Sequence, residues 1–320
     1  MRHSRQRNSM GWVGMVGALL IGCSSPPPPA PSPPPQPGPL VTQVQTLRAE
    51  GDRWVARGDL ARAEEAYMAA RRAAETLDDS RGLVGALNDL GRVATERRLV
   101  DQAVVLHRQA LTRAQQVGDP ALLLESLTAL GAAEQLAGRL SEAEQRYQQA
   151  LDLARQTGDR AAEAVLQNNV GLLYQAKGDA AQAEQYYRQA LDLNQALGHA
   201  EAEASNRVNL GLLAEARKDF ERAEQEYERA LALDKTAERR GRIAEDLVRL
   251  ARVAGLRGFP DRGLVFAERA YRAYLGQGDR QRAESALRQA VDFAARLGRK
   301  DEVRRLEAEW DGVKAPRPPR

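Results

Sequence analysis

One short pattern recurs through most of the chain at intervals of forty residues, without an insertion. Four columns of positions keep this register: one of glycine, two of alanine and one of ring-bearing residues. Their members are Gly51, Gly91, Gly131, Gly171 and Gly211; Ala63, Ala103, Ala143, Ala183 and Ala223; Ala70, Ala110, Ala150, Ala190, Ala230 and Ala270; and Tyr67, His107, Tyr147, Tyr187 and Tyr227. Columns that hold one register indicate a stack of similar supersecondary units, each too small to fold alone.

The residues that fill the repeat favour helices over strands. Aromatic residues make up only 5% of the chain and charged residues 28%, and Ala, Leu, Arg, Glu and Gln dominate after about residue 43. This mixture is typical of helices packed through small and aliphatic side chains. We expect the small columns to mark close helix crossings and the ring column to fill the space between successive hairpins. The prediction is an all-α solenoid of about seven antiparallel helix hairpins over residues 43–312.

The ends of the expected helices carry turn signals. Glycines expected to end the first helix of a hairpin are Gly58, Gly138, Gly178, Gly258 and Gly298. A glycine there adopts the left-handed conformation without steric cost. Aspartates expected to cap the next first helix are Asp79, Asp119, Asp159 and Asp279, and Pro120 suits the first helical position.

The offsets of 12, 4 and 3 residues between the glycine, alanine, ring and alanine columns resemble those of the tetratricopeptide repeat family. That family has a usual period of about 34 residues, and the six extra residues here fall between Ala70 and Gly91. Both helices are therefore expected to be longer, at roughly four turns or more. The segment Asn168 to Tyr174 is similar to the longer repeats of kinesin light chains. The resemblance implies a right-handed superhelix that binds proteins or peptide segments, with a degenerate seventh hairpin at about 281–312 as its cap and a disordered tail at 313–320.

The first 22 residues have the pattern of a secretory signal peptide, with a basic start and an apolar run from Met10 to Ile21. The run is too short for a stable transmembrane helix, which needs about 20 residues. The sequence Leu-Ile-Gly-Cys that ends at Cys23 resembles the bacterial lipobox. This resemblance implies that the chain is cut before Cys23 and lipidated on it; the alternative is an ordinary signal peptide with a chance cysteine.

A proline-rich stretch follows the only cysteine of the chain. Residues 26–39 contain ten of the 15 prolines, a composition typical of a polyproline II spacer. We interpret residues 23–42 as a tether, although a ligand for a proline-reading domain remains open. The expected location is the bacterial cell envelope, lipid-anchored. By resemblance to known sorting signals, Ser24 in place of aspartate favours the outer membrane, with the solenoid facing the periplasm.

The net charge argues against a nucleic-acid partner. Removal of residues 1–22 takes Lys and Arg from 47 to 44, against 44 Asp and Glu, so the mature chain is formally neutral and lacks the basic face that nucleic acid requires. The sequence contains three histidines and no Cys–His pair, nucleophile elbow or phosphate loop. We therefore expect neither an enzyme nor a cofactor or metal site.

The family resemblance implies that first helices line a concave groove. Residues expected to face it are Asn88, Asp89, Arg92 and Glu96; Glu125, Thr128 and Gln135; Asn168, Asn169 and Gln175; Ser205, Asn209 and Glu215; and Arg249 and Arg252. An Asn169–Asn209 ladder would hold an extended peptide backbone, since an amide both donates and accepts. Alternatively, the amides bond between adjacent helices. The two arginines would grip a carboxylate or pair with Glu215 or Glu245.

Three functions remain open at this point. The leading hypothesis is a lipid-anchored scaffold that docks partner proteins in the groove, for pilus, secretion or outer-membrane assembly. The second is a peptidoglycan-associated factor or regulator of cell-wall enzymes, for which Tyr174 is the main candidate aromatic platform. The third is self-association, in which the groove binds the tether or tail of another copy.

Overall fold

The computed structural model describes the backbone of residues 39–314 and the side chains of residues 43–311. Within that range the chain forms fourteen α-helices and no strand. They are α1 (Pro39–Ala56), α2 (Leu60–Thr76), α3 (Ser80–Glu96), α4 (Val100–Val117), α5 (Pro120–Leu136), α6 (Leu140–Thr157), α7 (Arg160–Ala176), α8 (Ala180–Leu197), α9 (Ala200–Ala216), α10 (Phe220–Thr236), α11 (Arg240–Leu256), α12 (Pro260–Gly276), α13 (Arg280–Arg296) and α14 (Lys300–Lys314). The predicted signal peptide, Cys23 and nearly all of the tether lie outside the described residues.

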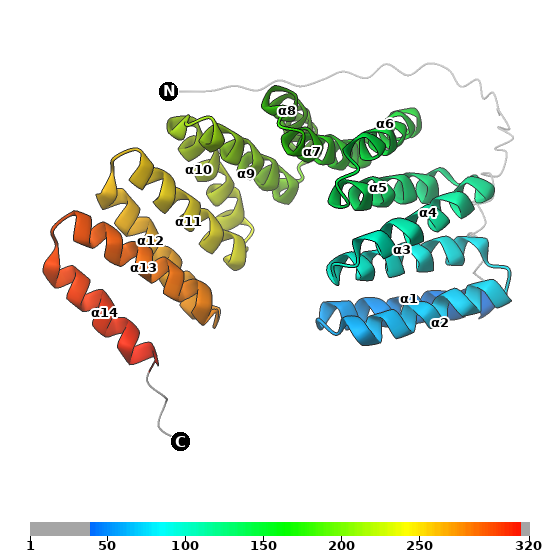
Figure 1. The fold of residues 1–320 in the computed structure, drawn as a ribbon, viewed down its shortest axis with the longest axis horizontal. Coiled ribbons are helices and arrows are strands. Elements are labelled where there is room, and N and C mark those ends of the chain that lie inside the picture. The colour runs from blue at the N-terminus through cyan, green and yellow to red at the C-terminus, as the bar shows by residue number, and fades with distance from the viewer. Residues whose placement is uncertain (1–38, 315–320) are drawn as a thin grey trace, which may run out of the picture. The chain divides into compact units, whose positions relative to one another are not determined.

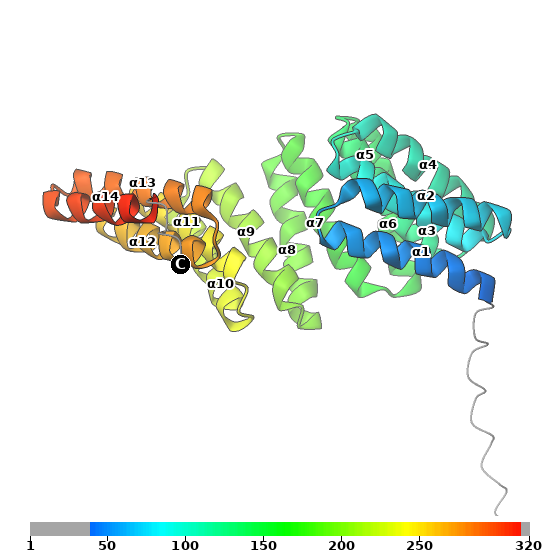
Figure 2. The same ribbon diagram turned by 90° about the horizontal axis from the view of Figure 1, so that it is seen from below.

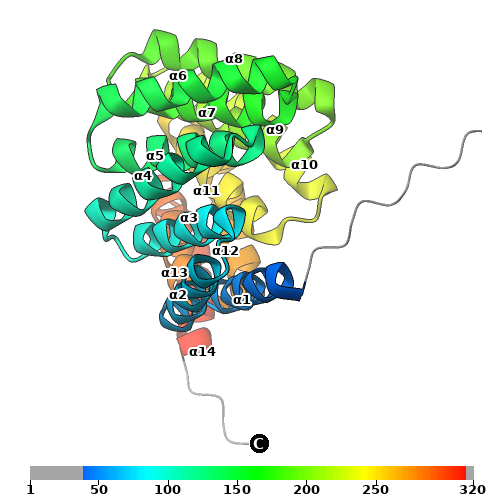
Figure 3. The same ribbon diagram turned by 90° about the vertical axis from the view of Figure 1, so that its right-hand side faces the viewer.

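The helices pair into seven hairpins, α1–α2 to α13–α14, which we number one to seven. Each helix packs on the next one along the chain, and the hairpins follow one another in chain order in Figure 1 and Figure 2. Figure 3 shows the same stack with the right-hand side of Figure 1 toward the viewer. The predicted all-α solenoid of seven hairpins is thereby confirmed. The first helix begins at Pro39, before the expected boundary at 43, and the last runs to Lys314. No helix of the described part is both long and apolar enough to cross a membrane.

The helices are long because the extra residues of the repeat extend them. Between α1 and α14 they run for 17 or 18 residues, which is almost five turns. The expected lengthening is confirmed, and short turns repeat with the same spacing. This regularity keeps corresponding side chains of successive hairpins in register.

The predicted turn glycines adopt left-handed backbone conformations. Their φ angles are all between +71° and +81°, at Gly58, Gly138, Gly178, Gly258 and Gly298. Two hairpins place a larger residue at this position, and it adopts the same conformation: φ is 63° at Arg98 and 62° at Lys218. The turn geometry is thus set by the packing of the helices, and glycine is the residue that meets it without strain.

Aspartate side chains cap helices at both kinds of turn. The predicted caps of first helices each accept a hydrogen bond from a backbone N–H of the first turn, at Asp79, Asp119, Asp159 and Asp279. Second helices are capped in the same way by Asp59, Asp179 and Asp219, which the sequence analysis did not single out. His199 occupies a cap position before α9 and makes no side-chain cap bond.

The columns of small residues and rings make up the core. All members of the two alanine columns are completely buried. The rings were expected to fill the space between hairpins, but each lies against the glycine of its own hairpin. A Cβ built on Gly131, for example, would be 2.8 Å from the Tyr147 ring. The glycine column therefore exists because it lets the second-helix ring reach the first-helix backbone.

Ion pairs also join each hairpin to the next. A basic residue at the end of a first helix pairs with a glutamate near the start of the preceding second helix. The pairs are Arg97–Glu64, Lys177–Glu144, Arg217–Glu184 and Arg257–Glu224. These charged side chains thus connect neighbouring repeats.

Candidate functional site

The first helices form the inner side of the stack in hairpins one to four. There α1, α3, α5 and α7 contact one another in succession, while the second helices approach one another less closely. Most first helices keep one stripe at helical spacing at least partly accessible; in α5 it includes Glu125, Ala129, Ala132 and Leu136. On α3 residues 84–91 are all buried, and the stripe is accessible only from Arg92 onward. We call the α5 stripe and the corresponding residues of α3, α7, α9 and α11 the groove face. On those four helices it includes Asp89, Arg92 and Glu96; Val165, Asn168, Asn169 and Leu172; Ser205 and Asn209; and Glu245, Arg249, Arg252 and Leu256.

At the α3 end, the groove face is a charged network. Arg48 Nε donates to Asp89 Oδ2 at 2.6 Å, and Arg92 donates to Asp52 and Tyr67 at 2.8 and 2.9 Å. Burial alone would raise the pKa of Asp52, but hydrogen bonds from Tyr67 and Arg92 outweigh it and lower that pKa. The predicted groove residues Asp89 and Arg92 are thus committed to ion pairs within the chain.

A buried polar cluster lies behind this network. Asn88 is 4% exposed; its amide donates to Ser126 Oγ at 3.1 Å and its carbonyl bonds His107 Nδ1 at 3.1 Å. Burial lowers the pKa of His107 to about 4, so the ring is neutral at neutral pH. Glu125 accepts a hydrogen bond from Asn88, and burial raises the pKa of this carboxyl group. In front of the cluster is a pocket of about 480 Å³, which continues to Ala129 and Leu136.

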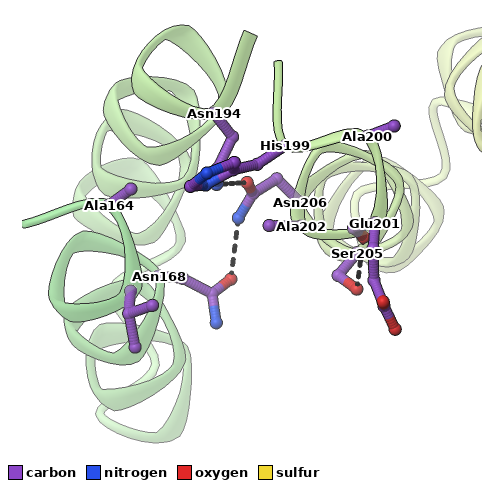
Figure 4. Close-up of a pocket in the computed structure, with 10 residues that line it drawn as sticks. Ala164, Asn168, Asn194, His199, Ala200, Glu201, Ala202, Ser205 and Asn206 are labelled. Carbon is purple, nitrogen blue, oxygen red and sulfur yellow. Dashed lines mark hydrogen bonds between the residues drawn. The ribbon is translucent and has the colours of Figure 1, made fainter. Parts of the chain in front are cut away.

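A relay of four amides joins hairpins four and five at the middle of the groove face; Figure 4 shows three of them, Asn168, Asn194 and Asn206. Asn194 donates to Asn206 at 2.8 Å, and Asn206 donates to Asn168 at 3.0 Å. Asn209 donates to the same Asn168 oxygen at 2.8 Å. Because the Asn168 oxygen accepts twice, its amino group is the part left to bond a ligand. The relay borders a pocket of about 530 Å³ that also includes Val165 and His199.

The ladder proposed from the sequence is therefore one residue out of register. Asn209 bonds Asn168 rather than Asn169, as in the alternative that amides bond between adjacent helices. Asn169 is half-buried and makes no hydrogen bond within the described residues. Helical spacing does not distinguish position 169 from position 168, since both residues lie near the same face of α7.

The other predicted residues divide between internal bonds and ion pairs. Thr128 donates to the Leu124 carbonyl of its own helix. Gln135 and Gln175 each accept a hydrogen bond from the ring hydroxyl of their own hairpin, at 3.1 and 2.7 Å. Each of these side chains satisfies a nearby polar group, so none of them is a free binding group.

The two arginines pair as the sequence analysis allowed. Arg252 donates to Glu215 at 2.8 Å. Arg249 donates to the buried Asp246 at 2.8 Å and lies 3.5 Å from Glu245. A ligand carboxylate would have to compete with these partners.

Exposed apolar side chains on the groove face were missed by the sequence analysis, which listed polar residues only. Val165 is 53% exposed, Leu136 57% and Leu172 39%. Leu256 of α11 is also exposed, at 51%. Val165 lies three residues before Asn168 and Leu172 three residues after Asn169, which is helical spacing on the same face, so the signal was present. Exposed apolar side chains gathered on one face are typical of a protein-binding surface.

The candidate aromatic platform is covered. The Tyr174 ring stacks on Tyr186 with centroids 5.4 Å apart, and the Lys177 ammonium lies 5.1 Å from its centroid. Its hydroxyl donates to Glu144 at 2.5 Å, and this bond raises the pKa of Tyr174 to about 12. The described residues include no group of three or more potential metal-ligating side chains.

Comparison with known sequences identifies the repeat. Residues 82–156 and 162–236 match the tetratricopeptide repeat family, which confirms the resemblance found in the sequence. The chain has no significant match among curated proteins. The match covers hairpins two to five, and the four columns are complete in each of them.

Solved structures share this architecture. BtubC (BKLC) from P. vanneervenii is 23% identical, with a TM-score of 0.52 over 89% of this chain and 96% of that one. A putative kinesin light chain with nearly identical repeats from Podosopora anserina is 17% identical, with a TM-score of 0.52 over 62% and 97%. A Rap protein complexed with Competence and Sporulation Factor is 14% identical, with a TM-score of 0.59 over 80% and 76%. These likenesses establish the fold.

Proposed function

The chain is a tetratricopeptide repeat protein, and on this premise we propose that it is a scaffold that docks partner proteins or peptide segments along its groove face. The observation that carries the proposal is the combination of exposed Val165 and Leu172 with the amides of Asn168 and Asn169 on one face of α7. Burial of apolar surface is the dominant favourable term in most protein–protein association, and amides can bond the backbone of the ligand. An enzyme would instead need converging reactive groups.

The chemistry of the face favours an extended segment with apolar side chains. The relay holds the Asn168 oxygen as a double acceptor, so its amino group is oriented to donate to a ligand carbonyl. The apolar residues extend this surface from Leu136 of α5 to Leu172 of α7. The charged network of α3 bounds it on one side. The Rap structure was solved with a bound factor, which is consistent with ligand binding on this fold.

We further propose that lipidation at Cys23 holds the scaffold in the bacterial cell envelope, with the proline-rich segment as spacer. The support is the lipobox-like sequence before the only cysteine. Two or more acyl chains give durable membrane attachment. Roles in pilus, secretion or outer-membrane assembly fit a binding solenoid on such an anchor. Cys23→Ser should release folded protein from the membrane fraction, and membrane retention of this variant would contradict lipid anchoring.

Site-specific photocrosslinking in cells tests the binding face. A photoreactive residue at position 169 or 172 should yield covalent protein adducts. The matched control is Gln185, which is exposed on α8, the second helix of the same hairpin. Adducts from 169 and 172 but not from 185 are expected. Equal labelling from all three positions, or none above background, would contradict the proposal.

A second variant separates binding from folding. Leu172→Glu places a charge on the exposed stripe, where it is solvated and does not disturb the core. It should abolish the adduct formed from position 169 while the circular dichroism and thermal unfolding of the protein stay unchanged. If the adduct persists, the apolar stripe is not part of the binding surface.

A further inference from the structure

A pair of buried carboxyl groups occupies the place, one repeat later, of two relay amides. Asp234 of α10 and Asp246 of α11 lie forty residues after Asn194 and Asn206. Asn194 and Asn206 are 3% and 1% exposed and bond each other at 2.8 Å. Asp234 and Asp246 are 2% and 0% exposed. The repeat thus builds the same contact twice, once from amides and once from acids.

The surroundings do not neutralise both acids. Arg239 lies 2.6 Å from Asp234 Oδ1, and Arg249 donates to Asp246 Oδ1 at 2.8 Å. Asp246 Oδ2 is buried without a hydrogen-bond partner among the described residues. In the preceding repeat the equivalent Asn206 amide reaches Asn168, but the residue corresponding to Asn168 is Val208. An apolar side chain therefore replaces the partner that would satisfy this oxygen.

The neighbouring charges are largely paired with one another. Arg239 also lies 3.4 Å from Glu201 of α9, so its charge is divided between two acids. On α11, Glu245 lies 3.5 Å from Arg249 and 3.4 Å from Arg282 of α13. From α12 the adjacent group is Tyr274, whose pKa is raised by burial, so it is neutral. Arg242 of α11 also lies 3.8 Å from Glu245, so each of these cations has an acid within 4 Å.

Two carboxyl groups in contact need one proton between them, because two buried like charges repel strongly. Asp234 and Asp246 are both buried and hold the positions of the bonded pair Asn194 and Asn206, one repeat later. Burial, followed by the effect of Asp234, raises the pKa of Asp246 despite the opposing charge of Arg249. An amide pair at the same place carries its own hydrogens and has no such requirement.

We propose that the joint between hairpins five and six is pH-sensitive: one proton shared by Asp234 and Asp246 holds α10 against α11, and its loss loosens this joint. The preceding joint, built from Asn194 and Asn206, stays closed over the same range. Arg249 links the pair to the groove face, since its guanidinium binds Asp246. The C-terminal two hairpins thereby move independently of the rest of the solenoid at higher pH.

The direction follows from proton binding. The closed joint binds one proton more than the opened joint, in which both carboxyl groups reach water. Raising the pH therefore favours the open form. The shared proton stabilises the closed joint fully only at a pH below the range in which an ordinary carboxyl group titrates. For one proton, the opening equilibrium constant rises by at most about tenfold per pH unit until the raised pKa is passed.

Hydrogen exchange of the full chain tests the proposal, with rates corrected for the intrinsic pH dependence of exchange. Between about pH 5 and about pH 8, amides of α10 and α11 should lose protection progressively. The double variant Asp234→Asn/Asp246→Asn, with Val208→Asn to restore the third amide, rebuilds the preceding relay. It should abolish the pH dependence of exchange in α10 and α11.

The reverse exchange is the matched test and does not depend on the first variant folding. Asn194→Asp/Asn206→Asp should introduce a loss of protection with rising pH in α8 and α9. A wild-type joint whose corrected protection is flat over this range would overturn the proposal. So would an unchanged slope in the amide variant, since the proton would then belong to another group.

Discussion

Gly171 lies so close to Tyr187 that a Cβ at position 171 would be 2.6 Å from the ring carbon Cδ1. Tyr187 is completely buried and its hydroxyl donates to Gln175 at 2.7 Å, so the ring is held at both ends. The contact explains why a glycine, which weakens a helix interior, recurs in the middle of five first helices. It also makes a simple prediction.

Gly171→Ala should destabilise the protein although alanine favours helices. Overpacking against a fixed ring costs about 1–3 kcal/mol, which exceeds the helix-propensity gain of about 1 kcal/mol. Urea denaturation should show a lower midpoint. Gly276→Ala is the control, because Gly276 is in α12 and a Cβ there would contact nothing within 4 Å. This control variant should be as stable as the wild type or more so.

Lys218→Gly should stabilise the fold. Lys218 has a φ of 62° at a turn where Gly178 has 80° in the preceding hairpin. The left-handed conformation costs an L-residue roughly 1–2 kcal/mol, partly offset by the greater flexibility of glycine in the unfolded chain. We expect a gain of about 0.5–1 kcal/mol in the free energy of unfolding. A loss would mean that the lysine side chain makes a compensating contribution.

Acidification should destabilise hairpins two and three through His107. Burial lowers its pKa from 6.5 to about 4, so the unfolded chain binds more protons between these values, and stability falls as pH falls through this window. The full effect is about 3 kcal/mol. NMR titration of the His107 ring measures the pKa directly. His107→Tyr restores the ring column and should remove this pH dependence; if the dependence persists, another group causes it.

Arg207→Met should be strongly destabilising. Arg207 pairs with Glu203 at 2.7 Å and Glu226 at 3.1 Å, and all three side chains are mostly buried. Removing the arginine leaves Glu203 without a cation among the described residues and Glu226 with Arg229 at 3.6 Å. Breaking such a buried pair costs about 3–5 kcal/mol. Arg252→Met is the control, because Arg252 is half exposed and its pair with Glu215 is worth at most about 1 kcal/mol. Similar losses from both variants would contradict this difference.

Some side chains could be placed from the sequence because the repeat makes their environment periodic. The alanine columns, the turn glycines and the Asp79 cap occupy the predicted positions, since each depends on local geometry that recurs every forty residues. The amide relay could not be placed this way. Asn206 is buried and Asn169 is not hydrogen-bonded, yet both are asparagines on first helices. Their difference depends on which helix crosses nearby.

The sequence by itself determined the repeat, the helix ends and the hairpin count, because backbone conformation and small-residue spacing act within one unit. Only the tertiary structure decided which polar groups meet across units. It moved the ladder from Asn169 to Asn168 and brought Asp234 to Asp246. It also placed each ring on the glycine of its own hairpin. These contacts depend on the angle and distance between neighbouring helices, which are set by the packing of all side chains at a crossing and not by any single column.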